Sequence, residues 1–167
     1  MLKRILIALA VIVAALAGLV AYVNVRGEEP IAEGAAPFSP TAEQVKRGEY
    51  LSRAGNCIAC HTARGGDAYA GGLGVRTPFG TVYSTNLTPD LKTGIGSWST
   101  AYFWRAMHNG RSKDGRLLYP AFPYPNYTQL TREDADAIFA YLLSVPPVEQ
   151  ARRPHELRFP YNSQAAL

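Results

Sequence analysis

The first pattern along the chain is a long apolar run close to its N-terminus. Ile5 to Val25 is almost uninterrupted apolar sequence, and the basic pair Lys3-Arg4 precedes it. At 1.5 Å of rise per residue, about 20 apolar residues cross the hydrocarbon core of a bilayer. Residues 1–25 are therefore predicted to anchor the chain in the inner membrane, with the following residues in the periplasm because basic residues stay cytoplasmic. A cleaved signal sequence is the alternative, with Ala15-Leu16-Ala17 as its A-x-A site.

Two segments with helical periodicity follow a linker. Residues 26–40 hold three Glu, three Pro and small residues without periodicity, which is typical of a linker. Thr41-Ala-Glu-Gln44 fits a capping box and predicts a helix that continues to about Ala54. Gly48 lies in the middle of this helix, where it costs about 1 kcal/mol against Ala, so we expect close packing against another helix there. Ser97 or Ser99 caps the next helix, which ends before Gly110.

The last predicted helix has the clearest apolar stripe. Thr131-Arg-Glu-Asp134 fits a second capping box, and Pro146-Pro147 ends the helix. Apolar residues recur at positions i, i+3, i+4 and i+7 within it: Ala135, Ile138, Phe139 and Leu142. A folded domain is thus predicted over residues 41–147, followed by a loop-like tail over residues 148–167.

Irregular segments separate these helices. Gly65 to Gly96 is rich in Gly, Pro and Thr, and Lys113 to Asn126 contains three prolines. So much irregular chain in a small domain is unusual unless it wraps something.

Composition excludes several classes of protein. The 167 residues carry a net charge of +4, which is too mild to indicate nucleic-acid binding. Only two cysteines are present, so a scaffold of several disulfides is excluded. A loop-rich domain of this size is expected to need a cofactor or a staple.

Those two cysteines form the motif that carries the chemistry. Cys57-Ile-Ala-Cys60-His61 has the C-x-x-C-H pattern of c-type haem attachment, in which both thiols reach the haem vinyl groups and the histidine binds the iron. A structural zinc site would need four ligands, and no second cysteine pair exists. A thioredoxin-like dithiol would need a βαβ context, which the pattern does not predict. The motif therefore predicts one covalent haem c with His61 as proximal iron ligand.

Residues 41–148 resemble a class I cytochrome c. More narrowly they resemble the first haem domain of the multihaem cytochrome subunits of membrane-bound alcohol, aldehyde and gluconate dehydrogenases. Besides the haem motif, the matching segments are Arg47-Gly-Glu-Tyr50, Thr77-Pro-Phe-Gly80, Tyr83-Ser-Thr-Asn86, Thr88-Pro-Asp90, Thr93-Gly-Ile-Gly-Ser-Trp98 and Leu118-Tyr-Pro-Ala121.

The resemblance implies a fold and a function. It implies an all-α cytochrome c fold that carries electrons and is not itself an enzyme. A partner dehydrogenase would supply the electrons, and a cytochrome, a quinone or an oxidase of the respiratory chain would accept them. Those subunits carry three haem motifs, whereas this chain has one and ends at Leu167. A free-standing relative and a truncated one are both compatible with that difference.

The sixth iron ligand is the second departure from the family pattern. The family loop reads Tyr-Pro-Ala-Met-Pro-Tyr and its Met binds the iron, but here Phe122 stands at that position. Met107, on the apolar face of the helix before Gly110, is the leading candidate. An open iron position is the next possibility, ahead of His108, and it would favour a ligand-binding or sensor domain over an electron carrier. His155 is expected to be a surface residue of the tail.

Other residues have less specific predicted roles. Trp98, Tyr83, Asn86 and Arg105 are candidates for hydrogen bonds to the haem propionates, with ordinary packing as the alternative. The sequence also places Arg105, Arg111, Lys113 and Arg116 close together, as a basic patch for an acidic partner or as a solvated face. A purely structural protein that docks a dehydrogenase is the remaining alternative.

Overall fold

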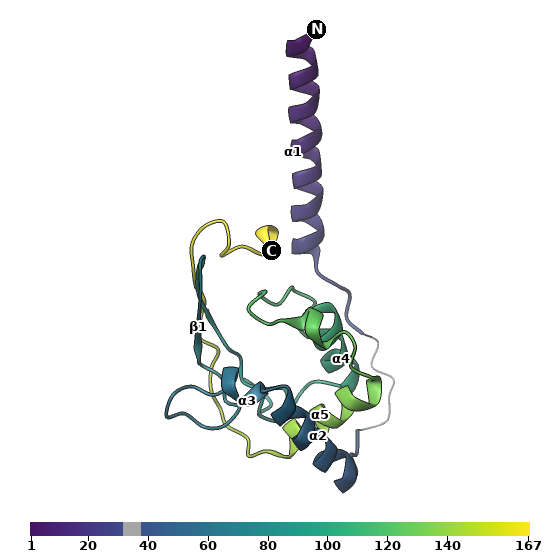
Figure 1. Ribbon diagram of the computed structural model, residues 1–167, viewed down its shortest axis with the longest axis vertical. Helices are drawn as coiled ribbons and strands as arrows, with labels where there is room; N and C mark the ends of the chain where they lie inside the picture. The colour runs from purple at the N-terminus through teal and green to yellow at the C-terminus, as the bar shows by residue number, and fades with distance from the viewer. Residues whose placement is uncertain (32–37) are drawn as a thin grey trace.

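An N-terminal helix stands apart from a folded domain (Figure 1). The computed structural model describes residues 1–31 and 38–167, so part of the predicted linker lies outside the described residues. Helix α1 (Leu2–Arg26) has no buried residue, and it is long and apolar enough to cross a membrane. The apolar run thus forms one continuous helix, as predicted.

Contacts at the end of α1 fix it to the folded domain. The backbone N–H of Glu28 donates to the Gly115 carbonyl at 3.2 Å, and its carboxylate lies 3.0 Å from Arg111 Nε. Asn24 donates to the Leu167 carbonyl at 2.5 Å. The first residues of the predicted linker are therefore part of the folded structure.

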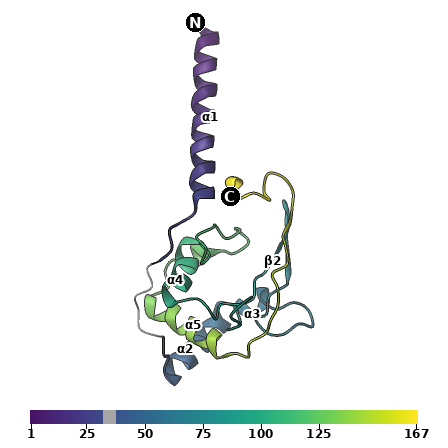
Figure 2. The same ribbon diagram turned by 180° about the vertical axis from the view of Figure 1, so that it is seen from behind.

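Three helices build what we call the helical half: α2 (Ala42–Ala54), α4 (Thr100–Asn109) and α5 (Arg132–Ser144). Helices α2 and α5 cross in direct contact in both views (Figures 1 and 2). A Cβ on Gly48 would lie 1.8 Å from the Ala137 carbonyl oxygen. The prediction of close helix packing at Gly48 is confirmed.

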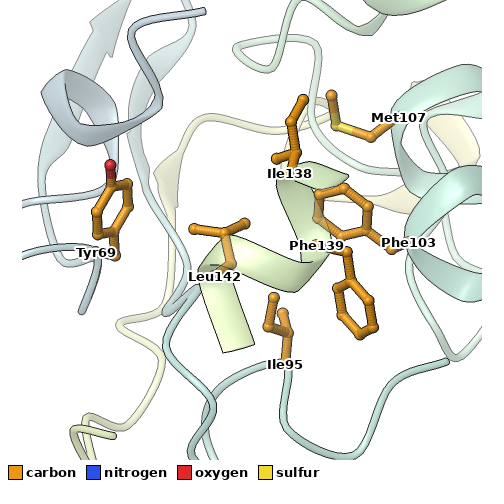
Figure 3. Close-up of a cluster of buried hydrophobic side chains, with 7 residues drawn as sticks. All are labelled: Tyr69, Ile95, Phe103, Met107, Ile138, Phe139 and Leu142. Atoms are coloured by element: carbon orange, nitrogen blue, oxygen red, sulfur yellow. The ribbon is translucent and has the colours of Figure 1, made fainter. Parts of the chain in front are cut away.

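The core cluster lies where these helices meet. The residues at its centre are Tyr69, Ile95, Phe103, Met107, Ile138, Phe139 and Leu142. Figure 3 shows Ile138, Phe139 and Leu142 on α5, with Phe103 and Met107 reaching toward them from α4. The four stripe positions predicted for α5 are all buried.

Side-chain caps start each helix of the helical half. Thr41 and Gln44 form both hydrogen bonds of a capping box, and Ser99 accepts from the Tyr102 N–H at the start of α4. Thr131 accepts from the Asp134 N–H at 3.1 Å. The Asp134 carboxylate instead accepts from Arg47 at 2.7 Å, so this residue links α5 to α2 and the second capping box is only half formed.

A small sheet corrects the expectation of an all-α fold. Strands β1 (Gly74–Thr77), β2 (Gly80–Tyr83) and β3 (Glu156–Leu157) pair antiparallel in that order. Gly80 adopts φ 132° at the turn, and a Cβ there would lie 2.1 Å from the Glu156 carbonyl oxygen. The glycine thus lets the tail approach the hairpin closely enough to pair. We call β1, β2, β3 and residues 148–167 the sheet-and-tail half.

The tail therefore has more structure than the expected loop. It runs beside the hairpin up to β3, turns away past the hairpin's tip and ends in the short 3-10 helix η2 (Gln164–Ala166), which contacts α1 (Figure 2). The Gln164 side chain accepts from the Leu117 N–H at 2.9 Å and donates to its carbonyl at 3.2 Å. These two bonds hold the tail against the loop that follows α4.

Candidate haem-attachment site

The two cysteines lie on a single helical turn directly after α2. Gly55 ends α2 by donating to the Leu51 carbonyl at 2.8 Å, and Asn56 turns the chain with φ 54°. Helix α3 (Cys57–Cys60) follows, and the His61 N–H closes its turn on the Cys57 carbonyl at 3.0 Å. The spacing that the motif predicts is thus realised as one turn.

Both thiols are unbonded and differ in exposure. Cys60 is exposed, whereas Cys57 is half-buried and packs against the core cluster. Burial raises the pKa of the Cys57 thiol, with the charge of Cys60 as a smaller cause. Two free thiols one turn apart are available for thioether bonds.

A backbone carbonyl fixes the tautomer of His61. Its Nδ1 lies 2.7 Å from the Thr85 carbonyl oxygen, just past β2. A carbonyl can only accept, so Nδ1 carries the hydrogen and Nε2 keeps its lone pair. Burial lowers the pKa of His61, and the bond to Thr85 opposes that shift in part. A neutral imidazole with Nε2 free is the form that binds iron.

The donor set fits a haem better than a free metal ion. Within residues 1–31 and 38–167, no three side chains among His, Cys, Asp and Glu are placed to hold a metal ion together. One oriented imidazole beside two thiols would leave zinc incompletely ligated. The same three groups are sufficient to attach haem c, because the porphyrin itself supplies four of the iron ligands and His61 supplies the fifth.

Phe122 lies in an aromatic stack beside the cysteines. Its ring stacks on Tyr127 with centroids 5.5 Å apart, and the Tyr127 hydroxyl donates to the Gly55 carbonyl at 3.2 Å. Tyr127 belongs to the 3-10 helix η1 (Tyr124–Tyr127). Phe122, Tyr127 and Cys57 all pack against the core cluster. The residue at the family's Met position therefore contributes packing.

The two candidate sixth ligands, Met107 and His108, lie in different surroundings. Met107 is 7% exposed and belongs to the core cluster, beside Ile138 in Figure 3. His108 stacks on Trp104 with ring centroids 3.5 Å apart, and its buried Nδ1 has no hydrogen-bond partner among the described residues.

The four side chains predicted at the propionates have other partners. Arg105 donates to the carbonyls of Ser112 and Lys113 at 2.7 and 3.0 Å. Asn86 donates to the Val148 carbonyl at 2.7 Å, and Tyr83 donates its hydroxyl to Glu156 at 2.9 Å. Trp98 packs against the core cluster. Each of the four has a contact that serves the fold.

Part of the predicted basic patch is likewise occupied. Arg105 and Arg111 lie 3.7 and 3.0 Å from the Glu28 carboxylate, and Lys113 donates to the Ser97 carbonyl. Arg116 pairs with Asp114 at 2.9 Å. These basic residues serve largely to attach the segment after α1 and to shape the loop after α4.

His155 is the residue whose predicted place is wrong. It is half-buried, and its Nδ1 accepts from the Tyr83 N–H at 3.0 Å because β3 brings the tail against β2. Together with Arg116, Tyr119 and Arg152 it lines a cavity of about 430 Å³. In the sequence, only the basic character of Arg116, Arg152 and His155 points to such a site, and the pattern does not show that the tail returns to the loop after α4.

Comparisons with known proteins agree with the motif. The sequence matches the family described as Cytochrome c over residues 45–146, which is more than half of the chain. It is 51% identical over 124 residues to the gluconate 2-dehydrogenase cytochrome c subunit of Pantoea cypripedii, covering 74% of this chain and 28% of that protein. It is 40% identical over 153 residues to the fructose dehydrogenase cytochrome subunit of Gluconobacter japonicus, covering 89% and 30%.

A third relative carries the similar segment in a much longer chain. One of the subunits of the nicotinate dehydrogenase of Pseudomonas putida is 49% identical over 138 residues, covering 79% of this chain and 12% of that protein. The chain thus spans less than a third of the length of each of these three relatives.

Proposed function

The chain belongs to the cytochrome c family, and from that premise we propose that it is a membrane-anchored periplasmic carrier of single electrons. One haem c is bound through thioethers at Cys57 and Cys60, with His61 as the proximal iron ligand. The observation that carries this proposal is the pair of free thiols on one helical turn beside an imidazole whose tautomer Thr85 fixes.

The haem supplies a one-electron ferric/ferrous couple, and the protein supplies everything that holds and tunes it. Cys57 and Cys60 tether it, and the Thr85 carbonyl keeps His61 oriented toward the iron. The aromatic stack of Phe122 and Tyr127 and the core cluster pack beside the half-buried Cys57.

The partner is a dehydrogenase. The relatives' names place them as subunits of gluconate, fructose and nicotinate dehydrogenases, which supports this assignment. In this chain α1 anchors the protein, and the contacts of Glu28 hold the domain at the membrane surface. One electron arrives from the dehydrogenase and leaves to a respiratory acceptor.

A redox-titrated optical spectrum of the purified full chain, with its intact mass, tests the proposal. We expect the mass of the chain plus one haem and a single one-electron transition. Thiols that remain free to alkylation, in protein from cells that mature c-type cytochromes, would overturn it.

Met107 is proposed as the sixth ligand. Its thioether is the only one in the folded domain, since Met1 lies at the start of α1. We expect Met107→Leu, which keeps the side-chain volume, to give high-spin ferric iron and a lower reduction potential. Phe122→Leu is the matched control and should stay low-spin.

The alternative function is a ligand-binding haem domain with an open iron position. It is favoured by the packing role of Phe122 at the family's Met position. Rapid carbon monoxide binding by the ferrous wild type, unchanged in Met107→Leu, would replace the electron carrier with this alternative.

A further inference from the structure

The cavity between the tail and the loop after α4 carries unbalanced positive charge. Arg116 and Tyr119 line it from the loop, and Arg152, His155 and Asn162 line it from the tail. Arg116 pairs with Asp114, but Arg152 forms no ion pair with any carboxylate that the structure describes. Two guanidinium groups therefore line the cavity, and the described residues that line it include no carboxylate.

The hydrogen bonds of His155 leave Arg152 without a side-chain acceptor among residues 1–31 and 38–167. The Tyr83 N–H donates to His155 Nδ1 at 3.0 Å, so Nδ1 must be the unprotonated nitrogen of a neutral ring. Nε2 then carries a hydrogen and cannot accept from the Arg152 guanidinium 3.0 Å away. Burial, then the charges of Arg152 and Arg116, lower the pKa of His155 to about 4, which keeps the ring neutral. Arg152, an exposed residue, thus lines the cavity with a guanidinium N–H that has no acceptor among the described side chains.

The cavity adjoins both segments that flank the haem-attachment site. Tyr83, which binds His155, is two residues before Thr85, whose carbonyl holds His61. Tyr119 stacks edge-on against His155 and is three residues before Phe122, which lies in the aromatic stack beside the cysteines. The cavity is therefore lined by chain that is continuous with two segments of the haem-attachment site.

We propose that Arg152 and Arg116 bind the propionate carboxylates of the haem. The inference rests on the proposed attachment of haem at Cys57, Cys60 and His61. The thioethers form at the vinyl-bearing edge of the porphyrin, and the propionates leave from the other edge. The tail, which lies outside residues 45–146, then completes the cofactor site.

The test is Arg152→Gln in the full haem-loaded chain, with Arg158→Gln as the matched control. Arg158 is an exposed arginine of the same tail that does not line the cavity, so the control removes the same charge. A cation beside the propionates favours the reduced state. We expect Arg152→Gln to shift the one-electron equilibrium toward the oxidised form by about tenfold, which is about 59 mV.

A second readout separates contact from distant charge. Redox-difference infrared spectra report the carboxylate stretching bands of the propionates, and these bands should move in Arg152→Gln and not in Arg158→Gln. Unmoved bands, or equal potential shifts in both variants, would overturn the inference.

Two further results keep the outcomes distinct. If Arg152→Gln loses its haem, Arg152→Lys decides: a restored potential supports the inference, and a potential that stays low refutes it. A wild-type chain without covalent haem would refute the proposed function itself, and that failure is visible in the intact mass before any variant is made.

Discussion

The helical half and the sheet-and-tail half are held together by different forces. In the helical half, large apolar side chains of α4 and α5 fill the core, and Gly48 lets the backbones of α2 and α5 touch. In the sheet-and-tail half the contacts are polar: Tyr83 bonds Glu156, and the Val148 carbonyl accepts from Asn86. Burial of apolar surface is enough to stabilise the helical half, whereas the sheet-and-tail half buries little apolar surface of its own.

This difference indicates where the cofactor matters most. A chain segment without its own apolar core remains ordered only if something else supplies the buried surface. His61 and Thr85 join the haem-attachment site directly to the end of β2. The sheet-and-tail half is therefore expected to depend on the bound haem, and the helical half much less.

The largest expected effect comes from removing the tether. In Cys57→Ala/Cys60→Ala the covalent haem is lost completely. We expect amide protection in β1 and β2 to fall at least ~tenfold, about 1.4 kcal/mol of local opening free energy, while the slowest amides of α5 keep theirs. Hydrogen exchange read by mass spectrometry gives both halves in one experiment. Equal losses in α5 and the strands would remove the distinction between the halves.

Gly48→Ala should destabilise the helical half. A Cβ would lie 1.8 Å from the Ala137 oxygen and 2.5 Å from its carbonyl carbon, so α2 and α5 must move apart. We expect a loss of about 3 kcal/mol in the free energy of unfolding, although Ala is normally the better helix former. Chemical denaturation of the haem-loaded chain measures it.

Ser52→Ala is the control for Gly48. Ser52 is buried on the same helix, and its Oγ has no hydrogen-bond partner within the part of the chain that the structure describes. Its removal should leave stability nearly unchanged. A similar loss in both variants would mean that the whole interface, and not the close approach at Gly48, is sensitive.

Arg153→Gln tests the sheet-and-tail half and should have a smaller effect on stability. The Arg153 guanidinium lies 3.9 Å from the centre of the Tyr83 ring and 3.0 Å from Glu156. Since these groups are partly exposed, we expect a loss of only about 0.5–1 kcal/mol. Thermal unfolding with Arg158→Gln for comparison checks this, and a loss as large as that of Gly48→Ala would contradict it.

Asp90 gives the smallest effect, visible only in acid. Hydrogen bonds from the Thr93 N–H at 2.6 Å and hydroxyl at 2.7 Å, then weaker ones, hold the pKa of Asp90 below its ordinary value of 3.8. The unfolded chain therefore binds this proton first, so the stabilisation is present above pH 3.8 and is lost as pH falls through the lower folded value. Asp90→Asn should flatten stability against pH in that range, and an unchanged acid profile would exclude Asp90 as a cause.

Local patterns in the sequence predicted the helical half well. The caps at Thr41 and Ser99, the end of α4 before Gly110 and the stripe of α5 depend on residues at most one or two turns apart. Gly48 predicted close helix packing because a glycine in the middle of a helix is destabilising unless a neighbouring backbone needs the space. The haem motif was equally local, since all its residues lie within one turn.

The sheet-and-tail half could not be predicted in this way. The pairing of β2 with β3 joins Thr81 to Glu156, and the cavity joins Arg116 to Arg152. Such contacts depend on how a long irregular chain returns, which periodicity does not encode. For the same reason no local pattern predicts that Arg152 of the tail lies beside Arg116 of the loop after α4.

The contacts of Glu28 with Arg111 and Gly115 attach the end of α1 rigidly to the folded domain. A domain on a long floppy tether would sweep a hemisphere and meet soluble partners from any direction. With α1 in a membrane, as we propose, these contacts would hold the redox centre at a set height and orientation over the lipid. Encounters would then favour proteins that travel in the plane of the same bilayer, so their frequency should follow lateral diffusion and surface density.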